Sequence, residues 1–182
     1  MKPILIIFWT SLCLGLISCS KEVKDVNLVT ASYRAADALL KNTREIDLYP
    51  NKALLVASFV DVDNVQLSST FGRMIAEQIG SRVAQRGYKV IEVKLRTQSI
   101  FVKGTENPNE GEFLLSRELQ DISLQHDAHA VIVGTYAKGP EVVYVTAKLI
   151  RTRDSTILGS YDYSLPVGKN TKKMLQDLRS HY

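Results

Sequence analysis

Near-continuous apolar runs alternate with segments of helical spacing through the middle of the chain. The runs are typical of strands covered on both faces, and they span residues 52–62, 88–95 and 130–137. Between the first two, a four-residue spacing predicts a helix that Ser68 or Ser69 caps and Gly87 ends. The apolar stripe of that helix is Phe71, Ile75, Ile79 and Val83. Further helices are predicted over residues 28–43 and 111–127, the latter with Leu115, Leu119 and Ile122 on its inner face.

The pattern changes after residue 137. Residues 141–151 and 156–165 alternate partially between apolar and polar, and the short connections "KGP" and "RDS" precede them. Antiparallel hairpins are the expected arrangement, followed by a last helix over about 170–179 with Asn170 as its cap. The predicted fold is a single α/β domain with about four helices on a five-stranded mixed sheet, whose parallel part precedes the antiparallel hairpins.

The N-terminus follows a pattern of its own. Met1-Lys2-Pro3 is followed by the uncharged run "ILIIFWTSLCLGLI", which is short of the roughly 20 apolar residues that span a bilayer and is typical of a signal-peptide core. Its end, "LISC", resembles the lipobox of bacterial lipoproteins, so residues 1–18 are interpreted as a lipoprotein signal peptide and Cys19 as the lipidated residue. The alternatives are an ordinary signal peptide with a chance cysteine, or an uncleaved anchor.

Lipid on Cys19 predicts where the protein resides. Two or three acyl chains hold a protein stably at a membrane, whereas one holds it only marginally. Ser20 rather than Asp follows Cys19, and by resemblance to the sorting rule of Gram-negative lipoproteins this favours the outer membrane. The polar residues 20–27 are interpreted as a tether. The chain is thus divided into a signal peptide (1–18), the lipidated cysteine with its tether (19–27) and a domain (28–182), which we expect in the periplasm.

Charge and cysteine content exclude some partners. The chain has 23 Lys and Arg against 19 Asp and Glu, a net charge of +4. Removal of residues 1–18 takes away Lys2 and Cys13, which leaves a surplus of +3 and one cysteine, so no internal disulfide is expected. This mild surplus lacks the basic stripe of a nucleic-acid-binding surface, and we expect no nucleic acid partner.

The sequence contains no catalytic or cofactor-binding motif. Phosphate-binding glycine loops are absent, and His126 and His129 lack a third metal ligand. Asp61, Asp63 and Asn64 favour a turn that ends a strand over a calcium site. We therefore expect no enzymatic activity, cofactor, metal or small-molecule substrate. Cross-strand packing, rather than a binding face, is the preferred interpretation of the tyrosines in the last three strands, Tyr136, Tyr144, Tyr161 and Tyr163.

The least regular segment, residues 96–112, carries Ile100, Phe101 and Val102 in a polar setting. Three adjacent apolar residues in such a loop have two interpretations. They either fold back as a short edge strand or form a contact patch for a partner.

The motifs "STFGR" (69–73), "LSREL" (115–119) and "VGTY" (133–136) resemble, in order and spacing, the FlgO family of flagellar outer-membrane lipoproteins, and the resemblance covers about residues 32–175. It implies a fold similar to the amino-terminal domain of TolB. It also implies a non-enzymatic lipoprotein that supports flagellar assembly, stability or motility by docking on periplasmic or outer-membrane flagellar components. The alternative is an envelope lipoprotein that binds and regulates a peptidoglycan synthase or another periplasmic partner.

We predict that Cys19→Ser releases the protein from the membrane without unfolding it, because the domain core predicted from residue 53 onward does not include that side chain. Detergent partition and incorporation of radiolabelled fatty acid measure the effect. Label on the Cys19→Ser protein, or unchanged partition, would contradict the lipid assignment.

Overall fold

The computed structural model describes residues 22–43, 52–65, 67–93, 101–102, 114–115 and 117–180. In chain order, its elements are α1 (Leu28–Asn42), β1 (Ala53–Ala57), β2 (Val60–Asp61), β3 (Leu67–Ser69), α2 (Thr70–Gln85), β4 (Val90–Val93), β5 (Phe101–Val102), β6 (Leu114–Leu115), α3 (Arg117–Gln125), β7 (Ala128–Lys138), β8 (Val142–Arg151), β9 (Ile157–Pro166), α4 (Lys169–Gln176) and β10 (Leu178–Ser180).

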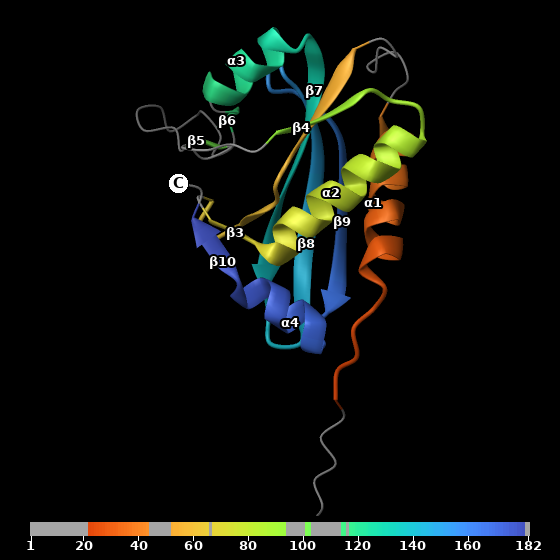
Figure 1. Ribbon diagram of the computed structural model, residues 1–182, viewed down its shortest axis with the longest axis vertical. Helices are drawn as coiled ribbons and strands as arrows, with labels where there is room; N and C mark the ends of the chain where they lie inside the picture. The colour runs from red at the N-terminus through yellow and green to blue at the C-terminus, as the bar shows by residue number, and fades with distance from the viewer. Residues whose placement is uncertain are drawn as a thin grey trace, which may run out of the picture.

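One mixed sheet organises the domain, with the strand order β4-β1-β7-β8-β9. β1 runs parallel to both β4 and β7, and β7, β8 and β9 then follow as antiparallel neighbours. Figure 1 shows α1 and α2 side by side across one face of this sheet, with α4 at its lower end and α3 at its upper end. The predicted α/β class, four helices and parallel-then-antiparallel order are confirmed.

The sheet has a sixth strand because the apolar run over residues 52–62 is not one strand. β1 ends at Ala57 and β2 begins at Val60, and β2 pairs only with β7. Between them, the backbone N–H of Phe59 donates to the carbonyl of Gly72, with N and O 3.3 Å apart. The run is interrupted there because this backbone group bonds to α2 instead of to a neighbouring strand.

Two apolar cores flank the sheet. The larger core lies between the sheet and the helices α1, α2 and α4, and the predicted stripe of α2 belongs to it: Phe71, Ile75, Ile79 and Val83 are each 0% exposed. The smaller core lies on the opposite face, where Leu119 of α3 packs on Leu55 and Val131. Both faces of β1 and of the first part of β7 are therefore covered, as their continuous apolar sequences predicted.

Two helix ends follow the predicted capping, and one helix start does not. The side chain of Ser69 accepts a hydrogen bond from the Gly72 N–H at α2, and Gly87 adopts a φ of 91° just after the C-cap Arg86. Of the helix predicted over residues 111–127, the part over residues 117–125 is helical. The prediction was wrong at Leu114–Leu115, which pair antiparallel with Phe101–Val102, a non-local interaction that satisfies backbone groups without a helix.

The C-terminal helix is also shorter than predicted. α4 ends at Gln176, and β10 then pairs antiparallel with β3. Asn170 does not cap α4. The N-cap is Gly168, which offers no side chain, and Asp25 from the N-terminal segment supplies the capping carboxylate instead.

Several sequence predictions lie outside the described residues, namely the signal peptide, lipidated Cys19 and Ile100. In the part of the chain that the structure covers, no helix is long and apolar enough to cross a membrane.

Ile79→Asp tests the packing of the larger core. A carboxylate at this fully buried position either stays unpaired in the core or separates α2 from the sheet, so we expect the free energy of unfolding to fall by several kcal/mol, on the order of 4. Thermal and denaturant unfolding measure the loss. Ser81→Asp is the matched control, because Ser81 lies exposed on the same helix. Equal midpoints for the two variants would show that α2 does not pack as described.

Candidate functional site

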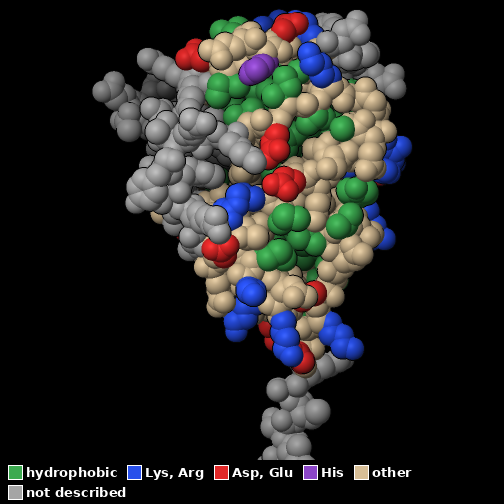
Figure 2. Space-filling view, in the orientation of Figure 1, with side chains coloured by type: hydrophobic (Ala, Val, Ile, Leu, Met, Phe, Trp, Pro, Cys, Tyr) green, Lys and Arg blue, Asp and Glu red, His purple; other side chains and the backbone are tan. Residues whose placement is uncertain are grey.

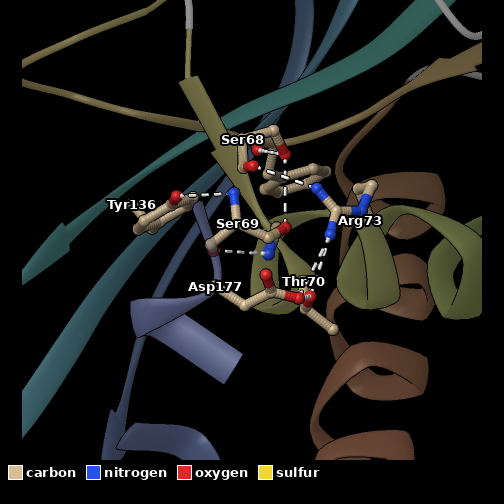
Figure 3. Close-up of polar contacts among 8 residues, drawn as sticks. Ser68, Ser69, Thr70, Arg73, Tyr136 and Asp177 are labelled. Atoms are coloured by element: carbon tan, nitrogen blue, oxygen red, sulfur yellow. Dashed lines mark hydrogen bonds and ion pairs between the residues drawn. The ribbon is translucent and has the colours of Figure 1, made fainter. Parts of the chain in front are cut away.

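Two of the three sequence motifs that are widely separated in the chain meet in the fold. "STFGR" forms the start of α2, and "VGTY" lies in the middle of β7. Figure 3 shows Ser68, Ser69, Thr70 and Arg73 near Tyr136 on one side and Asp177 on the other. This motif junction is therefore where the parallel half of the sheet, α2 and the C-terminal segment come together.

The interior of the junction is built around Phe59, whose side chain is fully buried. A Cβ added at Gly134 would overlap the Phe59 ring, and a Cβ at Gly72 would overlap the Phe59 carbonyl oxygen. The hydroxyl of Ser68 donates to that same carbonyl at 2.7 Å. The two motif glycines are thus required by close approach to Phe59, and not by an unusual backbone conformation.

Tyr136 completes the interior. Its ring is 1% exposed and packs edge-on against Phe71, with centroids 5.7 Å apart. Its hydroxyl oxygen accepts a hydrogen bond from the backbone N–H of Ser69 at 3.0 Å. Burial raises the pKa of Tyr136 above its ordinary value, against the opposing effect of that hydrogen bond. The phenol therefore stays neutral at physiological pH and serves as a hydrogen-bonding partner for the α2 N-terminus.

The rim of the junction is polar and partly accessible. The Arg73 guanidinium donates to the Ser68 carbonyl at 3.0 Å and to the Thr70 hydroxyl oxygen at 2.8 Å. The Thr70 hydroxyl in turn donates to the Asp177 carboxylate, and the Thr70 N–H donates to the Asp177 carbonyl at 3.2 Å. Arg73 and Asp177 also form a long ion pair of 3.9 Å. These contacts fasten the end of α4 to the start of α2.

The third motif and the apolar loop lie elsewhere. In "LSREL", Leu119 of α3 is 0% exposed and belongs to the smaller core, on the other face of the sheet. Phe101 and Val102 form β5, and their backbone pairs with Leu115 and Leu114 of β6 in a separate two-stranded sheet. A partner contact by residues 100–102 stays a prediction.

Three of the four tyrosines lie against the larger core, and Tyr144 does not. Tyr136 points into the larger core, whereas Tyr144 of β8 is 59% exposed. Tyr161 and Tyr163 stack along β9, with ring centroids 5.7 Å apart. The sequence grouped them by strand, but the alternation of side chains in a strand places Tyr144 on the opposite face of β8 from its buried neighbours Val143 and Val145.

The polar candidates show no catalytic arrangement. Asp61 accepts from the Asp63 N–H at 2.9 Å, which is the predicted side-chain turn. Within the described ranges, no three His, Cys, Asp or Glu side chains gather where they could hold a metal. An open hollow of about 830 Å³ lies at the upper end of the sheet, and its charged lining is partly satisfied by ion pairing of Lys52 with Asp127 at 2.7 Å.

Sequence reasoning missed two members of the junction, Phe59 and Asp177. Phe59 looked like one more apolar residue of a strand, and nothing in the local pattern marks it as the residue that two distant glycines accommodate. Asp177 was placed inside the last predicted helix, where its position as the C-cap of α4 could not be seen. The glycine in "VGTY", at the centre of an apolar strand, was the available signal, because such glycines often mark a close approach.

Known proteins resemble this chain at the level of family and of fold. A family model described as "FlgO protein" matches residues 33–170. No curated protein sequence matches the chain. The LpoB C-terminal domain from Salmonella enterica is similar in structure, with a TM-score of 0.52 and 11% identity over 76% of this chain and 98% of that one.

Two other solved structures are similar at lower scores. The LpoB C-terminal domain from Escherichia coli has a TM-score of 0.48 and 14% identity, covering 76% of this chain and 98% of that one. A PelC dodecamer from Paraburkholderia phytofirmans has a TM-score of 0.40 and 12% identity, covering 74% and 76%. At such identity the likeness to the Salmonella domain shows the fold alone, and TM-scores below 0.5 add no argument to it.

Gly134→Ala tests the junction. The new methyl group overlaps the buried Phe59 ring, so we expect a loss of about 1–3 kcal/mol in the free energy of unfolding. The loss is measured from the midpoint of denaturant unfolding, provided that the dependence of the free energy of unfolding on denaturant concentration is unchanged. In the control Gly80→Ala the new Cβ lies 3.6 Å from Val56 Cγ2, and the helix gains about 0.5–1 kcal/mol.

A double variant identifies the cause of that loss. If the Phe59 ring is what the methyl group meets, Phe59→Leu combined with Gly134→Ala loses less stability than the two single losses added together. Strict additivity would contradict the proposed packing.

Proposed function

Because this chain belongs to the FlgO family, we infer that it is a non-enzymatic lipoprotein of the bacterial envelope, held at the outer membrane by lipid on Cys19. In this proposal the domain lies in the periplasm. It supports flagellar assembly, stability or motility by docking on periplasmic or outer-membrane flagellar components.

Family membership is the observation that carries the proposal, and the motif junction supports its non-enzymatic part. The residues that best mark the family are used for packing and capping: Gly72 and Gly134 admit Phe59, and Ser69 caps α2. The polar rim residues Arg73 and Asp177 bond to each other and to neighbouring backbone. The Thr70 hydroxyl that donates to the Asp177 carboxylate also accepts from Arg73, so this contact belongs to the same network that fastens α4 to α2.

A second candidate is an envelope lipoprotein that binds and regulates a peptidoglycan synthase or another periplasmic partner. The fold shared with an LpoB domain does not choose between the two, because one fold can carry many functions. The two proposals differ in what fails when the protein is absent. The first predicts a defect at the flagellar base, and the second predicts a cell-wall defect with normal flagella.

We expect deletion of the gene to abolish or strongly reduce swimming and to alter the flagellar base in electron micrographs, and we expect the wild-type chain to restore both.

In complementation of the deletion strain, Phe101→Ser separates the two interpretations of the apolar loop. A folded, membrane-bound variant that fails to restore swimming identifies a partner contact. A variant that unfolds identifies a core role, since truncating a core aromatic costs roughly 3–5 kcal/mol.

Ile157→Ser is the control for that variant, because Ile157 is 53% exposed on β9, a strand of a different sheet. It should restore swimming fully. A deletion strain with normal motility and an altered cell wall would overturn the flagellar proposal in favour of the second candidate.

A further inference from the structure

The N-terminal segment is bound to the domain before α1 begins. The Asp25 carboxylate accepts hydrogen bonds from the backbone N–H groups of Asn170 at 2.8 Å and Thr171 at 3.0 Å. A Cβ at the N-cap Gly168 would overlap Asp25, so the carboxylate fills the place of a capping side chain. Burial opposes its ionisation, but the hydrogen bonds from Thr171 and Asn170 outweigh burial and lower the pKa of Asp25. Asp25 therefore stays charged and bound at neutral pH.

This contact limits how far α4 can lie from the site of attachment. Cys19 precedes Asp25 by six residues, and six residues of extended chain span at most about 22 Å. Glu22 is even closer to Cys19 in the sequence, and its carboxylate forms an ion pair with the Lys169 ammonium at 2.8 Å. Both of these side chains are largely exposed, so the ion pair adds little stability. The Asp25 cap is the contact that holds the segment against α4.

The end of the domain that is held near the anchor is basic. Lys169, Lys172 and Lys173 are exposed. Because Lys172 and Lys173 follow Lys169 by three and four residues, the three lysines share one face of α4. Lys24 adds a fourth exposed amine in the bound segment. Figure 2 shows Lys and Arg side chains gathered at the lower end of the described part of the molecule, with a few acidic side chains among them.

The acidic groups at this end are largely engaged. Glu22 pairs with Lys169, Asp25 caps α4, and Asp177 at the far end of α4 bonds to Thr70. Glu141 lies nearby, since its carbonyl accepts from the Val167 N–H at 2.7 Å.

Two exposed apolar side chains follow Lys24 closely in the sequence. Val26 is 45% exposed and Val29 is 43% exposed, and both are among the few large apolar side chains of the described residues that face solvent. Amines near exposed apolar side chains are typical of surfaces that rest on a bilayer, where the amines meet anionic headgroups and the apolar groups enter the interface.

We propose that this end of the domain is a membrane-facing surface that binds the headgroups of anionic phospholipids, and that the Asp25 cap holds the domain in this orientation. The inference rests on the proposed anchor at Cys19. The α4 surface consists of Lys24, Val26, Val29, Lys169, Lys172 and Lys173. The opposite end of the sheet, with α3 and the end of α1, then points away from the membrane.

Lysine footprinting on vesicles tests the proposal. The full chain, expressed in bacteria and extracted from membranes, is reconstituted in phosphatidylcholine vesicles with or without phosphatidylglycerol. A water-soluble acetylating reagent then labels lysine amines, and mass spectrometry gives the rate at each one. We expect Lys169, Lys172 and Lys173 to react several-fold more slowly on the anionic vesicles. Lys41 and Lys89, exposed at the other end of the domain, should be unaffected.

Salt and matched variants separate binding from mere proximity. At about 1 M salt, where the Debye length is near 3 Å, the difference between the two vesicles should disappear. Changing all three α4 lysines to Gln should remove the slowing at Lys24, whereas changing Lys41, Lys89 and Arg153 to Gln should leave it. Equal rates on the two vesicles, or equal slowing at Lys41 and Lys89, would overturn the proposal.

The orientation is tested by removing the cap. Asp25→Ala should reduce the slowing at the α4 lysines severalfold. Asn27→Ala, which removes the side chain that caps α1, should retain it. Full slowing in Asp25→Ala would contradict the orienting role of the cap.

The same sample distinguishes this inference from the proposed anchor, because the mass of its N-terminal peptide shows whether Cys19 carries acyl chains. Acylated protein with unprotected α4 lysines refutes the α4 surface and keeps the anchor. A chain that is neither cleaved nor acylated but has protected α4 lysines refutes lipidation and keeps the α4 surface. In that case the uncleaved apolar N-terminus would be the anchor, and it joins the domain through the same segment as Cys19 does.

Discussion

The ring of Phe59 lies where a side chain at position 134 would otherwise be, and this packing decides how the parts of the domain meet. Phe59 sits between β1 and β2, so its burial fixes where the first strand is interrupted. Its backbone N–H and carbonyl bond to Gly72 and Ser68 at the start of α2. Tyr136, two residues after Gly134, then reaches the Ser69 N–H from β7. One buried aromatic residue thus sets the position of α2 on the sheet.

This arrangement separates the scaffold from the surfaces that a partner or a membrane can use. The family motifs supply close packing, a helix cap and a buried phenol. Apart from the partly accessible rim of the junction, the accessible features are the lysines of α4 at one end and the charged hollow near Lys52 and Arg151 at the other. Under the proposed function, the body of the domain between those two ends would hold its far surface at a defined distance from the anchor.

Local pattern was enough for much of the fold, and it failed where long-range contacts decide. The stripe from Phe71 to Val83 and the cap Ser69 could be predicted because periodicity and capping act within a few residues. The division of the first strand at Phe59, the pairing of β6 with β5, and the pairing of β10 with β3 could not, because each depends on a partner distant in sequence. The prediction of the residue that caps α4 failed for the same reason. Asn170 was the local candidate, but the capping carboxylate belongs to Asp25, 145 residues earlier.

Residues 169–180 supply the partners for groups that lie much earlier in the chain, namely Asp25 and β3. Asp25 has its partners only once Asn170 and Thr171 exist, and β3 has a neighbouring strand only once β10 has formed. During synthesis the β3 edge and the segment around Asp25 therefore stay without these partners until residues 169–180 have been added, and contacts of such sequence separation form late. Exposed edges invite aggregation and proteolysis. Residues 169–180 thus complete the domain, since a chain that lacks them leaves the edge of β3 unpaired and open to proteolysis.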